Sequence, residues 1–329
     1  MLRARAARLV AGGFLLLAAA FGAGCAAVQS ERLLASAAAF PQPIELDDVP
    51  FFPQEDYQCG PAALATVLSY SGVAITPEQL TPQVYVPQRQ GSFQVELLAA
   101  ARRHERVPYL VPPQLEALAA ELASGNPVLV LQNLGLAFAP TWHYAVVIGL
   151  DLARGEIVLR SGRNRRHVVS LATFEHTWRR GDYWAVVVLP PEQLPFTALE
   201  LPYLDAVLAL EQTGKLETAA LAYASATQRW PQSLPALMGL GNARHALGDL
   251  AAAEQAFRRA VRFHPTAAAA HNNLAQTLAD QGRYGEAEIS ARRALELAGA
   301  GPLREQLQQT LDGIVKAREN GTGRDGSVR

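Results

Sequence analysis

The pattern of hydrophobic and polar positions divides the chain into two parts at a proline-rich stretch, residues 190–202. Before it, apolar residues first follow a helical spacing, which predicts helices from Pro61 to about Tyr70, over 92–104 with Ser92 as N-cap, and over 114–125. Short β-branched runs follow at 127–134, 143–151, 156–162, 166–171 and 183–190. Helices followed by strands predict an α+β domain with an antiparallel sheet.

Beyond residue 200 the pattern is helical throughout and repeats every 34 residues. The aligned columns are Gly214, Gly248 and Gly282; Leu216, Leu250 and Tyr284; Ala219, Ala253 and Ala287; Ala226, Ala260 and Ala294; and Pro231 and Pro265, with Gly299 in the third copy. Small alanines let two antiparallel helices approach closely, and the glycines turn the chain between them. This phasing resembles the tetratricopeptide repeat and implies about three repeats over residues 200–316. Stacked helical hairpins form a groove suited to peptides, so we expect a protein partner there.

The two ends of the chain have compositions unlike the rest. Residues 1–25 combine three early arginines, an apolar run and small residues, which indicates a secretory signal peptide. The final "GAGC" resembles the lipobox of lipoproteins, which implies a lipid on Cys25; ordinary cleavage near Ala23 is the alternative. The resemblance favours an outer-membrane lipoprotein that faces the periplasm, with residues 26–45 as a tether. A polar, glycine-rich end predicts a disordered tail over residues 317–329.

Overall composition excludes several classes of function. The chain has 329 residues, of which 50% are hydrophobic and 18% charged, and its formal net charge is −1, so a nucleic-acid partner is not expected. Neither a phosphate-binding loop nor zinc-ligand spacing occurs, so we expect no cofactor and no metal. With Cys25 lipidated, Cys59 has no partner for a disulfide. A lone thiol in an oxidising compartment indicates a reactive group, although a buried, inert cysteine is the alternative.

Candidate chemistry centres on residues 54–68, "QEDYQCGPAALATVL". Cys59 precedes Gly-Pro and should lie at a helix start, where the helix dipole favours a thiolate. The backbone N–H groups of Cys59 and Gly60, and the side-chain amide of Gln54, could stabilise an oxyanion. Of the seven histidines, His143 opens a strand pattern, "HYAVVIG", and is the candidate base; a core histidine with a satisfied hydrogen bond is the alternative.

Taken together, "QEDYQCGPAALATVL" and "HYAVVIG" resemble the papain-like cysteine peptidases of the bacteriocin-leader-processing, double-glycine type. The resemblance covers about residues 46–190 and includes "TFEHTWRRGDYWAVVVL", which is similar to the closing segment of that family. It leaves residues 191–199 as a linker to the repeats. It implies a papain-like fold and a peptide or protein substrate. It also implies that Cys59 is the nucleophile, His143 the base and Gln54 the oxyanion donor.

Two positions depart from the family pattern. Gln58 replaces the usual Asp before the cysteine, and Ser161 stands where an Asp usually orients the histidine. A serine can accept a hydrogen bond from the imidazole but cannot stabilise its charge as a carboxylate does. Asn164 is an alternative orienting residue, since related enzymes use Asn in this role.

These departures leave more than one functional hypothesis. The first is a membrane-tethered cysteine peptidase whose repeats recruit proteins. The second is a lipoprotein scaffold in which a degenerate peptidase fold binds peptides without cleaving them. A third, acyl or amide transfer by the same thiol chemistry, stays open.

Overall fold

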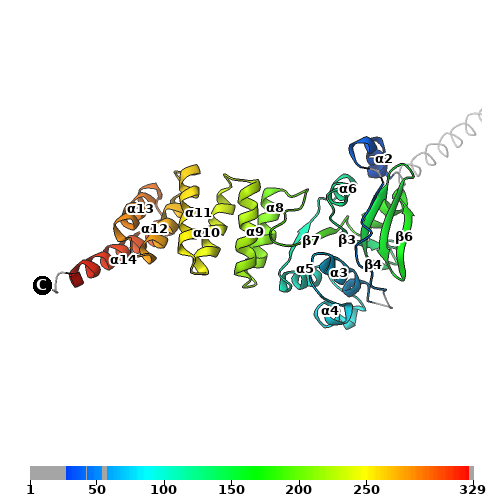
Figure 1. Ribbon diagram of the computed structural model, residues 1–329, viewed down its shortest axis with the longest axis horizontal. Helices are drawn as coiled ribbons and strands as arrows, with labels where there is room; N and C mark the ends of the chain where they lie inside the picture. The colour runs from blue at the N-terminus through cyan, green and yellow to red at the C-terminus, as the bar shows by residue number, and fades with distance from the viewer. Residues whose placement is uncertain (1–26, 42, 54–57, 326–329) are drawn as a thin grey trace, which may run out of the picture.

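The computed structural model describes residues 27–325, apart from residue 42 and residues 54–57 (Figure 1). A seven-stranded antiparallel sheet forms the N-terminal part, with strand order β2-β7-β3-β4-β5-β6 and the short β1 paired with β4. The strands are β1 (Ile44–Glu45), β2 (Val107–Leu110), β3 (Val128–Asn133), β4 (Trp142–Asp151), β5 (Glu156–Ser161), β6 (Asn164–Ser170) and β7 (Ala185–Leu189).

Helices cover both faces of this sheet. They are α2 (Val28–Ala35), α3 (Cys59–Tyr70), α4 (Pro77–Val84), α5 (Gln94–Arg103), α6 (Leu115–Ala123) and α7 (Leu171–Arg179), with 3-10 turns η2 (Ala37–Ala39) and η3 (Pro87–Arg89). Alternation along β4 sends Val146 and Ile148 into a core with α3, α4 and α5, and sends Ala145 and Val147 into a second core with α2, α6 and α7. The two helical layers lie on opposite sides of the sheet in Figure 1.

The antiparallel α+β domain is confirmed, but several local expectations were incomplete or wrong. Helix α3 begins at Cys59, two residues before the expected start. Ser92 is not a cap: α5 begins at Gln94 without a side-chain cap, and the Ser92 hydroxyl is buried without a hydrogen-bond partner among the described residues. The pattern also missed β2, α4 and α7. Helix α7 lies inside the segment that resembled a sheet-forming end, because its amphipathic residues pack Phe174 and Trp178 under the sheet.

The region expected as a tether contains α2, which is fixed to the domain. Leu33 is fully buried against the core under the sheet. The buried carboxylate of Glu175 accepts hydrogen bonds from the backbone N–H groups of Gln29 (3.1 Å) and Ser30 (2.7 Å), so it satisfies donors that the first turn of a helix leaves free. Gln29 in turn accepts from the backbone N–H of Leu115 at 2.7 Å.

The predicted linker, residues 191–199, is also fixed in place. The carboxylate of Glu121, fully buried, accepts hydrogen bonds from the backbone N–H of Thr197 (2.8 Å) and from its hydroxyl (2.6 Å). The Tyr109 hydroxyl donates to the carbonyl of Thr197 and accepts from the N–H of Leu199, each at 3.1 Å. Tyr203 packs beyond it in the same core as the sheet. The sheet and the first repeat therefore share one hydrophobic core.

The C-terminal part is all helical, as expected. Its helices are α8 (Glu200–Glu211), α9 (Leu216–Arg229), α10 (Leu234–Ala246), α11 (Leu250–Phe263), α12 (Ala268–Asp280), α13 (Tyr284–Leu297) and α14 (Pro302–Asp325). They pack as three hairpins and a final helix that extend away from the sheet (Figure 1). The expected disordered tail starts at residue 317, whereas α14 continues as a helix to Asp325. An ion pair between Arg318 and Glu288 of α13 holds this extension.

Candidate active site

The N-terminus of α3 places Cys59 beside β4 of the sheet. Cys59 is the first residue of the helix and is a free, half-buried thiol. Gly60 follows because no side chain fits there: a Cβ on it would lie 2.6 Å from the Cβ of Ser92. The rest of the helix to Leu68 is buried, since it is apolar on every face. Packing of the whole helix against the sheet therefore fixes the position of the sulfur.

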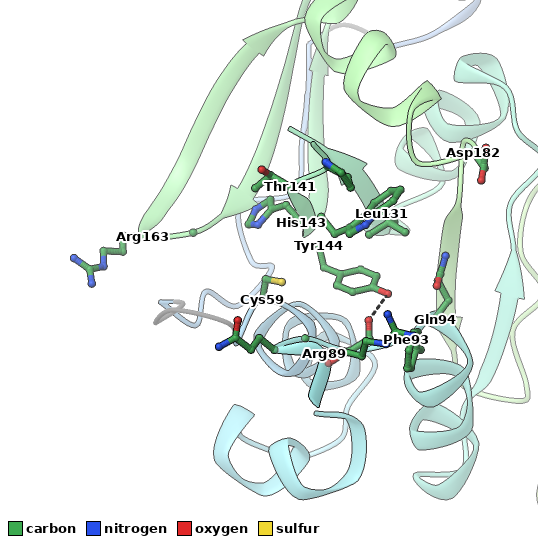
Figure 2. Close-up of a pocket in the computed structure, with 16 residues that line it drawn as sticks. Cys59, Arg89, Phe93, Gln94, Leu131, Thr141, His143, Tyr144, Arg163 and Asp182 are labelled. Atoms are coloured by element: carbon green, nitrogen blue, oxygen red, sulfur yellow. Dashed lines mark hydrogen bonds between the residues drawn. The ribbon is translucent and has the colours of Figure 1, made fainter. Parts of the chain in front are cut away.

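His143 lies where β4 and β5 separate. The ladder between these strands begins at the pair Val146 and Arg160, so residues 142–145 have no partner strand on that side. The helix start occupies this opening, where the backbone N–H of Tyr144 is close enough to the Cys59 sulfur to favour its thiolate. Figure 2 shows Cys59, which belongs to α3, and His143, which belongs to β4, on the same side of one cavity.

The end of β5 brings a hydroxyl to the imidazole. His143 Nε2 lies 2.8 Å from Ser161 Oγ. With its proton on Nε2, the imidazole donates to this hydroxyl, and Nδ1 is then free to accept a proton from Cys59. Asn164, the alternative orienting residue, begins β6 as an exposed side chain and makes no hydrogen bond with His143. Of the two candidates, the structure places only Ser161 against the imidazole.

Burial sets the protonation of both groups. Desolvation raises the pKa of the Cys59 thiol, although backbone N–H groups of Tyr144, Gly60 and Cys59 itself oppose the shift. Desolvation, with a smaller contribution from His167, lowers the pKa of His143 to about 4. Both shifts favour a neutral thiol beside a neutral imidazole. The sequence argument expected a thiolate stabilised by the helix dipole; in the folded chain, loss of hydration outweighs the backbone N–H groups that favour the thiolate.

The candidate pair opens into a cavity of about 960 Å³. Sequence reasoning did not identify most of its walls, which include the η3–α5 loop, the start of β4, and the turn after α7. The described lining residues besides Cys59 and His143 are Arg89, Gln90, Gly91, Ser92, Phe93, Gln94, Leu131, Pro140, Thr141, Trp142, Tyr144, Gly162, Arg163 and Asp182. Exposed Trp142 and Phe93 were visible in the sequence only as apolar residues near turns, a signal too common to mark a cavity.

Two predicted residues fall outside the described part of the chain. Gln54, the predicted oxyanion donor, and Cys25, the predicted lipidation site, therefore stay predictions.

Within the described ranges, no group of three or more His, Cys, Asp and Glu side chains could hold a metal ion. Over the same residues, no helix combines the length and apolar character that crossing a bilayer requires.

Comparison with known families agrees with the two-part architecture. Residues 46–185 match the model of the Peptidase_C39 like family. Residues 204–268 and 256–289 match two models of the tetratricopeptide repeat. The chain therefore consists of a Peptidase_C39-like domain followed by tetratricopeptide repeats. This relation was expected from residues around Cys59 and His143 and from the 34-residue period.

Similar solved structures each cover one part of the chain. A putative C39-like peptidase from Bacillus anthracis is 18% identical, with a TM-score of 0.38, and the match covers 45% of this chain and 98% of that one. The Yersinia enterocolitica type III secretion chaperone SycD, solved with a peptide of the translocator YopD, is 20% identical, with a TM-score of 0.34. That match covers 36% of this chain and 91% of the chaperone chain. A comparison with curated proteins found no match. At this level of likeness, activity has to be argued from the residues of this chain.

Proposed function

We propose that the chain is a cysteine peptidase in which Cys59 is the nucleophile and His143 the general base. The observation that supports this proposal is their juxtaposition: a free thiol at the start of a buried helix and an imidazole on the facing strand line one cavity, and Ser161 holds the far nitrogen of the imidazole at 2.8 Å. The chain thus supplies the three groups that thiol acyl transfer uses: a nucleophile, a base and an orienting group.

Neutral resting groups determine how the reaction begins. As the Cys59 sulfur attacks the peptide carbonyl carbon, its proton passes to Nδ1 of His143, so the base acts during the attack rather than before it. The backbone N–H of Cys59, with the amide of Gln54, stabilises the oxyanion. His143 then gives the proton to the leaving amine, and a thioester remains. Water, deprotonated by His143, hydrolyses the thioester, releases the carboxylic acid and restores the thiol.

A digest of a peptide library tests the proposal. The intact protein should cleave a subset of peptides, and mass spectrometry would read the residues on both sides of each cleaved bond. Cys59→Ala and His143→Ala should abolish cleavage, whereas His176→Ala, a half-buried histidine of α7 outside the cavity, should leave it intact. The same readout tests whether this domain shares the double-glycine specificity of the type it resembles. Cleavage that survives in Cys59→Ala would exclude the mechanism.

A second candidate, a domain that binds peptides without cleaving them, is favoured by three observations. The raised pKa of Cys59, the lowered pKa of His143 and the absence of a carboxylate at Ser161 all weaken the nucleophile. Labelling with an iodoacetamide probe at pH 7 separates the two. A coupled pair requires that labelling of Cys59 falls in His143→Ala. Equal labelling of both proteins, together with peptide binding but no cleavage, would support the binding domain.

The proposal extends to the location and the repeats. We infer that a lipid on Cys25 attaches the protein to the periplasmic face of the outer membrane and that the repeats recruit a protein partner. Palmitate labelling and membrane fractionation of the wild-type chain and Cys25→Ser test the anchor; label on Cys25→Ser would contradict it.

The exposed hydrogen bond between Asn242 of α10 and Asn273 of α12, 2.8 Å long, marks a repeat surface for paired alanine substitutions. These should raise KM for a protein substrate but not for short peptides.

A further inference from the structure

The cavity continues well beyond the candidate catalytic pair. In Figure 2, Cys59 and His143 lie on one side of it, and Asp182 and Gln94 lie on the other. Leu131 and the ring of Tyr144 lie between the two ends. Tyr144 is held by a hydrogen bond from its hydroxyl to the carbonyl of Ser92 (3.1 Å) and by an edge-on contact with Trp184, with ring centroids 5.9 Å apart.

Asp182 supplies the only carboxylate among the described residues that line this cavity. Its side chain is exposed and forms neither an ion pair nor a hydrogen bond with any described residue. The other charged lining residues are placed differently. The Arg89 guanidinium lies over the ring of Phe93, 5.8 Å from its centroid, and the side chain of Arg163 points away from the cavity in Figure 2. An unpaired negative charge is thus left at the end far from Cys59.

The turn that carries Asp182 is rigid and unfavourable for ordinary residues. Asp182 and Tyr183 both adopt left-handed backbone conformations, with φ of 54° and 53°. Hydrogen bonds from their N–H groups to the carbonyls of Arg179 and Trp178, each 3.0 Å, close the turn. Gly181 packs against β3, where a Cβ would lie 3.0 Å from the carbonyl carbon of Leu131. Tyr183 is the strained residue of the pair, and the turn that it shares with Asp182 places that carboxylate at the wall of the cavity.

We propose that Asp182, assisted by the side-chain amide of Gln94, forms a subsite for a basic side chain of the peptide substrate. The inference rests on the proposed function, because it assumes that the cavity binds a peptide across Cys59. A lysine or arginine at this end gains a charge-assisted contact with the carboxylate, and the amide oxygen of Gln94 is a second acceptor. The apolar wall of Leu131 and Tyr144 suits the aliphatic stem of such a side chain.

The test compares two pools of fluorescein-labelled octapeptides, in which one position is either Lys or Met and the others are randomised, scanned over all positions. Binding is measured by fluorescence anisotropy with Cys59→Ala, so that cleavage does not interfere. At one position, Lys should bind about fivefold more tightly than Met at low salt, and 0.5 M NaCl should reduce this difference. Lys in place of Met at the same position should also raise kcat/KM for cleavage by the wild-type protein.

The decisive variant is Asp182→Asn in the Cys59→Ala background. Asn tolerates the left-handed conformation as well as Asp does, so the turn is preserved and only the charge is lost. The preference for Lys should disappear in it and persist in Asp205→Asn, an exposed carboxylate of α8 outside the cavity.

A preference that survives Asp182→Asn, a preference for acidic peptides, or no charge preference at any position would overturn the inference. Failure of the proposed function has a different signature, since binding would keep its dependence on Asp182 while the wild-type protein cleaves nothing.

Discussion

Replacing Ser161 by Asp should strengthen the candidate catalytic pair. Ser161 Oγ lies 2.8 Å from His143 Nε2, so a carboxylate on the same residue would come within hydrogen-bonding distance of the imidazole. Ser161 ends β5, is only partly buried and precedes Gly162, which lines the cavity, so there is space for a side-chain rotation that accommodates Asp. The substitution adds the one feature that a hydroxyl lacks, a negative charge that stabilises the imidazolium.

Burial determines the starting point. The pKa of His143 is lowered to about 4 and that of Cys59 is raised, so both shifts oppose moving the proton from sulfur to nitrogen in the empty site. A carboxylate within about 4 Å raises the pKa of an imidazole by about 1–3 units. The population of the ion pair should therefore rise by at least about tenfold.

Alkylation by iodoacetamide at pH 7 measures this change directly. Ser161→Asp should react faster at Cys59 than the wild-type chain, because the ion pair adds a second reactive form of the thiol. The titration of His143, followed by NMR of labelled histidine, should move to between about 5 and 7. Wild-type Cys59 should react about tenfold faster for each pH unit up to 9 without a plateau near neutrality, because its pKa is raised. The rate at which library peptides are cleaved should likewise be higher in Ser161→Asp than in the wild-type chain.

Ser161→Asn is the matched control, because its amide has the shape of the carboxylate without the charge. The reasoning requires that Asp accelerates alkylation and that Asn does not. If both accelerate it equally, the gain comes from orientation of the ring. If Ser161→Asp is no faster than the wild type, or if wild-type Cys59 already shows a plateau of reactivity below pH 7, the proposed neutral resting state is refuted.

Three further predictions concern stability. His143 has a folded-state pKa below its ordinary 6.5, so the stability it contributes is complete above pH 6.5 and is lost as the pH falls to about 4. In urea titrations, the free energy of unfolding should therefore fall by about 3 kcal/mol less over this pH range in His143→Gln than in the wild type. An equal fall in both proteins would contradict the shift. Gly60→Ala should lower the free energy of unfolding by about 1–3 kcal/mol because the new Cβ meets Ser92. Gly285→Ala, with open space around it, should leave that free energy unchanged. If Gly60→Ala is as stable as the wild type, Ser92 moves aside without cost. Glu121→Ala should cost more than about 2 kcal/mol in thermal or urea unfolding, since the buried donors of the linker lose their acceptor, and a flexible linker would show no change.

Local pattern was sufficient where the structure depends on neighbours in sequence. The 34-residue period fixed the helical hairpins, because each repeat packs only on the next, and Gly214, Gly248 and Gly282 adopt φ of 79°, 78° and 77° at the same turn in each copy. Alternation and β-branching located the central strands to within two residues. Weak signals failed: β2 has four residues and includes a proline, and it forms a strand because β7 pairs with it.

The sequence by itself determined which residues could react and which folds could hold them: Cys59 before Gly-Pro, a histidine at the head of an apolar strand, and a solenoid behind them. It left Ser161 as the candidate orienting residue with Asn164 as the alternative, and only the opening between β4 and β5 put Ser161 against His143. Tertiary structure also decided the charge of the site, because a pKa depends on how much water the packed chain removes, and that burial comes from segments far apart in the sequence. The same long-range packing brought Asp182 to the wall of the cavity that Cys59 faces.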